Sequence, residues 1–323
     1  MSDTLALHNP IPPVDDVLRD ELANGDALIE TIAPIMRHLL ANDEHSVFSD
    51  EIVARVRGML NDVARQLLDG LAEAAGTPDE RDHDPDRLQQ LVEGYVAHPG
   101  FLAHAHALAL EWQLTERLQA RLALDPVLSP LLQSLIASPD AGVASSAMAL
   151  LSAQARFAQS QRRMQLALAE LPADLLDAAL GGMRRYADSE PDLASIGQQA
   201  EQDVRGRYDE RRGRIGLIAQ LVGTMGGGAT AALAVGHAGV AIFLSALAMA
   251  SGQNRNMAIL ATNEGQLARL ALALRAAGLQ PQLVEEQFVA LHPDFALPAG
   301  FDQLGSDRAA ALLARSTALS RAG

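Results

Sequence analysis

Apolar side chains recur every three or four residues along almost the whole chain, which is the spacing of one face of an α-helix. The stretch 50–75 is the clearest example, with Ile52, Val56, Leu60, Val63, Leu67 and Leu71 on one face. An earlier helix is expected over 26–40, with Pro34 kinking it. No stretch alternates apolar and polar residues for long enough to predict a strand. The pattern therefore predicts an all-α protein.

Short polar caps followed by proline mark the starts of several helices. Thr77-Pro78-Asp79-Glu80 has the form of a capping box, and a cap with proline recurs at Asp84-Pro85, Asp125-Pro126 and Ser138-Pro139-Asp140. Short turns between amphipathic helices predict antiparallel neighbours, as in a bundle or a stacked-helix solenoid. After residue 85 we expect helices near 86–97, 100–122, 126–137, 140–165, 172–187, 192–213, 215–224, 229–251, 255–277, 281–290 and 306–320.

The segment 126–159 supports the solenoid most directly, because it predicts a helix, a Ser-Pro-Asp turn and a second helix. In the second helix an aspartate caps the start, a valine and a leucine face the core, and an alanine permits close approach of the next helix. This is the spacing of the inner helix of a HEAT-type repeat, and its residues are Asp140, Val143, Ala147 and Leu151.

The stretch 128–186 resembles an uncharacterised family of alphaproteobacterial proteins that carry a HEAT-like domain of unknown function. The residues that carry the resemblance are SLIASPDAGVASSAMALLSAQARFAQSQRRM followed by ELPADLLDAAL. The segments 237–243 and 269–279 are similar to the same family, so the resemblance covers roughly 100–295. It implies an all-α repeat fold and carries no activity with it.

Charge sets the N-terminal third apart. The formal net charge is −15, and residues 1–100 carry 20 acidic and 7 basic side chains, whereas residues 201–323 carry 10 and 11. The charged, proline-bearing stretch 76–86 is the best candidate for a boundary. We therefore predict an acidic helical N-terminal subdomain over 1–80 and a helical-repeat domain over 81–323.

Composition excludes several classes of function. The chain has no cysteine, which excludes thiolate metal sites and cysteine nucleophiles. Its net negative charge argues against a nucleic-acid partner. All 25 basic residues are arginine, so a Walker phosphate loop, which needs lysine, is excluded. Abundant alanine and arginine are typical of a GC-rich bacterial genome, and 1–14 lacks the apolar core of a signal peptide. These features predict a bacterial cytoplasmic protein.

The run 215–254 has no charge, and 229–250 is long enough to cross a bilayer. It is rich in alanine rather than leucine, the triplet Gly226-Gly227-Gly228 interrupts it, and His237 lies near its middle. We favour a buried helical hairpin, with membrane insertion as the alternative.

Few side chains suggest chemistry. His104 and Glu111 share a helix face, but two ligands are too few for a metal site, and His106 points elsewhere. We predict no catalytic residue, no cofactor and no metal site. If the chain were an enzyme, His104, Glu111 and His237 would be examined first.

Three arginine doublets are the best candidates for a contact surface, because aligned guanidinium groups recognise carboxylates on a partner. The simpler interpretation is solvated helix faces and a helix end. The six residues are Arg162, Arg163, Arg184, Arg185, Arg211 and Arg212.

Together these observations predict a non-enzymatic protein-binding scaffold or regulator of helical-repeat type. Its partner would be another protein and not a nucleic acid, and self-association stays open. The alternatives are a membrane-associated protein inserted through 229–250 and an enzyme whose site the sequence does not reveal.

Overall fold

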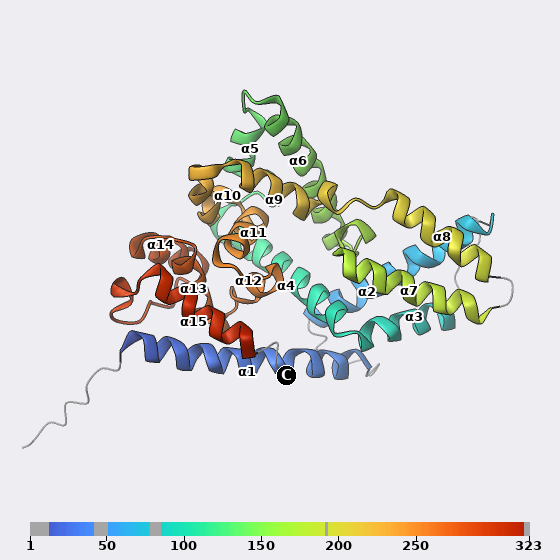
Figure 1. The fold of residues 1–323 in the computed structure, drawn as a ribbon, viewed down its shortest axis with the longest axis horizontal. Helices are drawn as coiled ribbons and strands as arrows, with labels where there is room; N and C mark the ends of the chain where they lie inside the picture. The colour runs from blue at the N-terminus through green and yellow to red at the C-terminus, as the bar shows by residue number, and fades with distance from the viewer. Residues whose placement is uncertain (1–12, 42–50, 78–84, 191–192, 320–323) are drawn as a thin grey trace, which may run out of the picture. The chain divides into compact units, whose positions relative to one another are not determined.

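The computed structural model describes residues 13–41, 51–77, 85–190 and 193–319, and within these ranges the chain forms only helices and the segments that join them (Figure 1). The predicted all-α class is confirmed for this part of the chain. Most of the predicted capping box at 77–80, and the predicted cap at Asp84, lie outside the described residues.

The chain divides into two compact units. One consists of residues 1–29 and 261–323, and the other of residues 30–260. Helix α1 (Val14–Ala41) supplies residues to both. The predicted boundary near residue 80 falls at 78–84, outside the described residues, and stays a prediction.

The unit formed by residues 30–260 is built around α2 and α4. Helix α2 packs against α3, α4, α7 and α8, and α4 also contacts α6, α11 and α12. The elements are α2 (Glu51–Ala74), α3 (Pro85–Ala97), α4 (Pro99–Leu122), α5 (Pro130–Ile136), α6 (Ala141–Arg162), η1 (Leu168–Glu170), α7 (Ala173–Ser189), α8 (Ala194–Arg207), η2 (Glu210–Arg212), α9 (Arg214–Thr224), η3 (Gly226–Leu233), α10 (Val235–Ala238), α11 (Val240–Ser251) and α12 (Arg255–Leu260).

The predicted amphipathic face of α2 forms part of this core. Val56, Leu60, Val63 and Leu67 are completely buried. Full burial of such a side chain contributes about 1.5–3 kcal/mol, so the three- and four-residue spacing that predicted the helix also provides its packing energy.

Helix α6 begins as predicted. Asp140 is its N-cap, and its Oδ1 accepts hydrogen bonds from the backbone N–H groups of Gly142 (2.7 Å) and Val143 (3.1 Å). Such a cap satisfies amides that have no partner within the helix. Ala147 is completely buried, as expected, but Leu150 rather than Leu151 takes the deep core position.

The expected helices over 229–251 and 255–277 are each interrupted. Gly239 ends α10 with a φ of +75°, and a Cβ on it would lie 2.9 Å from the Cβ of Ser129. Only glycine fits both conditions, so the chain turns there before α11 begins. A turn at 261–263 likewise separates α12 from α13 (Leu267–Ala276). Within the described residues, no helix combines the length and apolar character needed to span a membrane.

The unit formed by 1–29 and 261–323 joins the two ends of the chain. Its elements are the first half of α1 with η4 (Glu264–Gln266), α13, α14 (Pro281–Leu291), η5 (Phe301–Gln303) and α15 (Ser306–Leu319). The guanidinium of Arg269, completely buried on α13, binds the carboxylate of Asp26 on α1 and the hydroxyl of Ser316 on α15. Gln266 donates to the carbonyl of Gly25 at 2.6 Å. Polar contacts therefore fasten α1 to the C-terminal helices.

Candidate functional site

A buried cluster of charges lies where α4, α9, α12 and η1 meet. Glu111 on α4 is 1% exposed, and its two carboxylate oxygens face the guanidinium of Arg214 at the start of α9. Arg214 Nη1 donates to Glu111 Oε1 at 2.7 Å. Arg255 on α12 donates to the same carboxylate at 2.8 and 2.9 Å. Each pair brings together residues more than a hundred positions apart, so the cluster fixes the relative positions of three helices.

Glu170 on η1 completes the cluster, since its carboxylate accepts from Arg214 Nε at 2.9 Å. Two carboxylates and two guanidinium groups leave the cluster neutral, which is the condition under which buried charges are tolerated. Burial alone would raise the pKa of Glu111, but the two guanidinium groups hold it well below its usual range. The two guanidinium groups therefore favour the ionised form of Glu111.

The guanidinium of Arg214 is also packed against an aromatic ring. Its Cζ lies 3.5 Å from the centroid of the Phe157 ring on α6. A cation over a ring face is attracted by the ring quadrupole. The cluster thus links α6 to the three helices already joined, and Arg214 is a structural centre of this unit.

His104 lies at one side of the same cluster, on the face of α4 that also carries Glu111. Burial lowers the pKa of His104 to about 4, so its ring is neutral at pH 7. Its Nε2 lies 3.2 Å from the backbone carbonyl of Glu170, which can only accept, so Nε2 carries the proton. The Asn256 side chain also bonds the ring. These contacts hold the neutral imidazole in place.

The other candidate histidine does not join this cluster. His237 is exposed on α10. Among the described residues no group of three or more His, Asp or Glu side chains is arranged to hold a metal ion.

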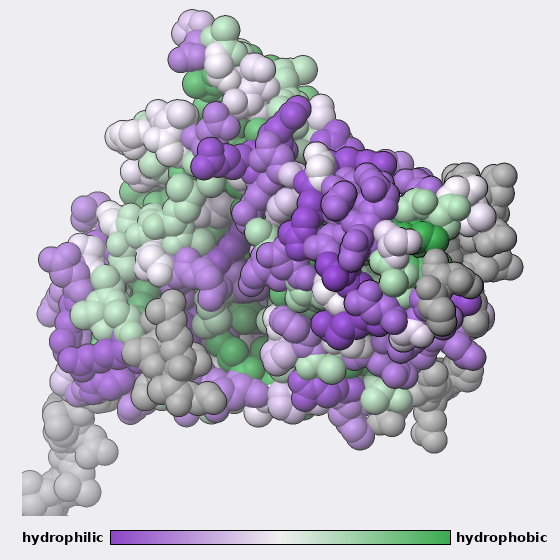
Figure 2. Space-filling model, turned by 45° about the vertical axis from the view of Figure 1, so that its right-hand side comes forward, coloured by the Kyte–Doolittle hydropathy of each residue, from purple (hydrophilic) through white to green (hydrophobic). Residues whose placement is uncertain are grey.

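Two hollows open beside the cluster. One, of about 220 Å³, is lined by His104, Glu170, Asn254, Arg255 and Asn256 among others. The larger, of about 590 Å³, lies between α6, η1, η2 and the end of α8. We name the larger one the arginine groove, because Arg156, Arg207, Arg212 and Arg214 line it. In Figure 2 the surface where α8 leads towards η2 is hydrophilic.

The arginine groove contains more positive than negative side chains, although the chain as a whole is acidic. Its only lining carboxylates among the described residues are Glu170 and Asp209. Glu170 is paired with Arg214, and Asp209 accepts from the backbone N–H of Arg211. Arg207 Nη1 lies 3.6 Å from Glu73 Oε2, and both side chains are exposed. Arg156 and Arg212 form no ion pair within the described part of the chain, so their charges are available to a ligand.

The six predicted contact arginines have different positions. Arg212 lines the arginine groove, and Arg162 and Arg163 follow its wall residue Ser160 at the end of α6. Arg184 is paired with Glu201 at 3.1 Å. Arg185 lines a separate groove between α3 and α7, and Arg211 is exposed on η2. Whether they bind a partner stays a prediction.

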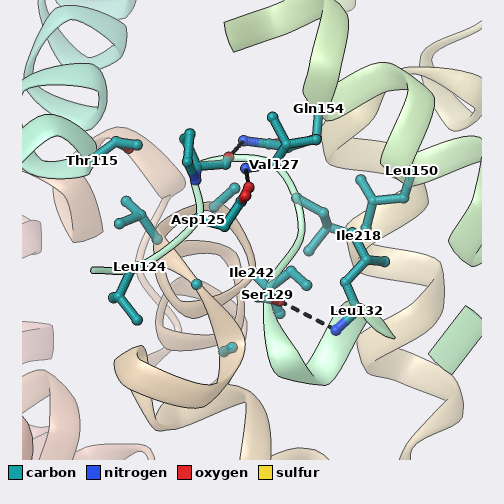
Figure 3. Close-up of a pocket in the computed structure, with 15 residues that line it drawn as sticks. Thr115, Leu124, Asp125, Val127, Ser129, Leu132, Leu150, Gln154, Ile218 and Ile242 are labelled. Atoms are coloured by element: carbon teal, nitrogen blue, oxygen red, sulfur yellow. Dashed lines mark hydrogen bonds between the residues drawn. The ribbon is translucent and has the colours of Figure 1, made fainter. Parts of the chain in front are cut away.

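A third hollow, between α5, α6, α9 and α11, is too small for a ligand (Figure 3). Its volume of about 20 Å³ matches a single water molecule. Gln154 reaches it and donates to the carbonyl of Pro126 at 3.0 Å, while its Oε1 is buried without a partner among the described residues. Ser129 caps α5 beside it by accepting from Leu132 N at 3.2 Å. This hollow is a feature of the packing.

Sequence reasoning missed Arg156, Arg214 and Arg255. The available signal was Glu111, a lone carboxylate on the apolar stretch 101–112, because a charge at such a position needs a buried partner. Arg214 and Arg255 flank the uncharged run 215–254 and were the nearest cations to that run.

Comparison with protein-family models, with curated proteins and with solved structures finds no match to this chain. Only the geometry of the described residues therefore bears on the function of the chain.

Proposed function

We propose that this chain is a non-enzymatic scaffold of helical-repeat type that binds an acidic segment of a partner protein in the arginine groove. The proposal includes a HEAT-like stacking of its helical hairpins, kinship with the alphaproteobacterial family named above, and a bacterial cytoplasmic location. The observation that carries it is the pair Arg156 and Arg212, two guanidinium groups without ion pairs in the described residues, on one groove of an acidic protein.

The size and chemistry of the groove fit a short acidic segment. A volume of about 590 Å³ holds a few side chains. Guanidinium groups bind carboxylates through paired hydrogen bonds, which gives orientation as well as attraction. The neutral cluster behind the groove supports this function, since Glu111 and Glu170 hold Arg214 in place while Arg156 and Arg212 remain at the surface.

Peptide binding tests the groove. A fluorescein-labelled octaglutamate peptide would be titrated with the full chain at low ionic strength and followed by fluorescence anisotropy, with a Gly-Ser peptide of equal length for comparison. The double variant Arg156→Gln/Arg212→Gln should bind octaglutamate on the order of tenfold more weakly, because two exposed ion pairs are lost. Arg121→Gln is the matched control, since Arg121 is exposed on α4 and does not line the groove.

Partner capture tests the scaffold. The tagged wild type, the double variant and Arg121→Gln would be purified from the native host without detergent. A stoichiometric protein should accompany the wild type and the control and be lost from the double variant. Equal octaglutamate binding by all three proteins, or wild-type protein that elutes alone, would overturn the proposal.

A further inference from the structure

A second groove, separate from the arginine groove, lies between α3 and α7. Its volume is about 500 Å³, within the range of small-molecule sites. Tyr95 on α3 and Phe101 at the start of α4 form its deep wall, with ring centroids 4.8 Å apart. His98 meets Phe101 edge-on at 5.5 Å. In a chain with few aromatic residues, this groove gathers an unusual share of them.

Three glycines inside helices open this groove: Gly94 on α3, and Gly181 and Gly182 on α7. Helix packing does not require glycine at any of them. A Cβ on Gly94 would meet nothing within 4 Å, and the nearest atoms to a Cβ on Gly181 or Gly182 would lie at 3.5 Å, an ordinary contact distance. Alanine would therefore fit, and it would stabilise the helix.

Other glycines of the same unit differ in this respect. A Cβ on Gly58 would lie 2.7 Å from the Met164 side chain, and one on Gly197 would lie 2.6 Å from that of Ala187. Close helix packing explains those two. The three glycines of the α3–α7 groove have no such explanation: Gly94 faces open space, and Gly181 and Gly182 leave room for the guanidinium of Arg185 beside the aromatic wall.

Two polar groups at this groove have no partner within the described residues. Tyr95 is 3% exposed, and its hydroxyl makes no hydrogen bond there. The guanidinium of Arg185 lies over the two glycines of α7 and forms no ion pair in the described part of the chain. The nearby carboxylate of Asp177 does not neutralise it, since Asp177 is bound by Arg205 at 2.5 Å. A buried hydroxyl without a partner is unfavourable, and a ligand acceptor would satisfy it.

We propose that the groove between α3 and α7 binds a small aromatic carboxylate, whose ring lies against Tyr95 and Gly94 and whose carboxylate is bound by Arg185 where its guanidinium lies over Gly181 and Gly182. An aromatic ring in contact with the Tyr95 wall gains offset or edge-on packing. The carboxylate supplies the anion that Arg185 lacks, and a small turn of the buried Tyr95 side chain would bring its hydroxyl to the second oxygen. This site is independent of the arginine groove, with which it shares no residue.

Calorimetric titration of the full chain with benzoate, phenylacetate, cinnamate and 2-naphthoate tests the site. The amide of each acid is the matched uncharged probe. At least one acid should bind about tenfold or more tightly than its amide, because only the acid pairs with Arg185. Arg185→Gln should remove this difference, whereas Arg121→Gln and the double variant Arg156→Gln/Arg212→Gln should keep it.

Two further variants separate binding from folding. Gly181→Ala/Gly182→Ala should raise the Tm by about 2–4 °C per substitution, since alanine favours the helix, yet bind the acid at least tenfold more weakly. Tyr95→Phe should leave the Tm unchanged, because its hydroxyl has no partner to lose among the described residues, and weaken binding of the acid. Binding of no acid at 10 mM, equal binding of acids and amides, or unaltered binding by the glycine variant would overturn the proposal.

Discussion

Replacing Glu111 by glutamine tests the buried charge cluster most directly. The change keeps the volume of the side chain but leaves Arg214 and Arg255 facing an amide, so the cluster gains a net positive charge. Removing one partner of a buried ion pair costs about 3–5 kcal/mol. Arg214 keeps Glu170, and Arg255 is 15% exposed and can turn towards water. We therefore expect the lower end, a loss of about 3 kcal/mol in the free energy of unfolding.

Urea unfolding followed by tryptophan fluorescence measures this loss. Trp112 is the only tryptophan in the chain, is buried, and is the neighbour of Glu111 on α4. Glu116→Gln is the control, because this glutamate is exposed on the same helix and its replacement should change stability by no more than about 0.5 kcal/mol.

A second variant shows whether charge is the cause. Glu111→Gln/Arg255→Gln restores neutrality, so it should be more stable than Glu111→Gln alone by about 1 kcal/mol. If Glu111→Gln lowered the free energy of unfolding by less than about 1 kcal/mol with an unchanged urea dependence, the reasoning on buried charge would be wrong.

Three further predictions concern other parts of the chain. Burial lowers the pKa of His104 to about 4, below its unfolded value of about 6.5, so stability should fall as pH drops through this interval. The loss between pH 7 and pH 5 should be about 2 kcal/mol in urea unfolding, and His104→Gln should flatten it. Asp26→Asn removes the charge of the carboxylate that Asp26 presents to the buried Arg269 and should lower the free energy of unfolding by about 3 kcal/mol. Hydrogen exchange in the first half of α1 should rise, and unchanged exchange would contradict the prediction. Gly216→Ala places a Cβ against the backbone of η2 and should lower the free energy of unfolding by about 1–3 kcal/mol. Gly70→Ala, in open space, should not lower the Tm.

The sequence predicted the helices well where one face is continuously apolar and a cap is local. The range 50–75 and the cap at Asp140 are examples, because spacing and a single side chain determine them. The predictions were wrong where a contact between residues far apart in the sequence determines the course of the backbone. Gly239 breaks the expected helix over 229–251 by its close approach to Ser129, a residue about a hundred positions earlier. The start of α1 at Val14 was also missed, since its apolar face is covered by helices from the other end of the chain.

The candidate sites depended even more on tertiary structure. The shared face of His104 and Glu111 could be predicted from helix geometry, but their burial among two arginines could not. The arginine doublets could be picked out because their members are adjacent in the sequence. Arg156 and Arg212 line the same groove although 56 positions separate them in the sequence. The glycines of the α3–α7 groove gave no signal, because a lone glycine in a helix looks the same whether it serves packing or leaves space.

The fastening of α1 to the C-terminal helices has a consequence for synthesis of the protein. Asp26 leaves the ribosome 243 residues before its partner Arg269. At about 5–20 residues per second, the two are separated by on the order of 10–50 s. During that time Leu18 and Leu22, buried in the finished unit, have no C-terminal helices to cover them. The apolar face of the first half of α1 should therefore stay uncovered during most of the synthesis of the chain. Chaperones that bind such segments should hold it until the C-terminal helices have emerged.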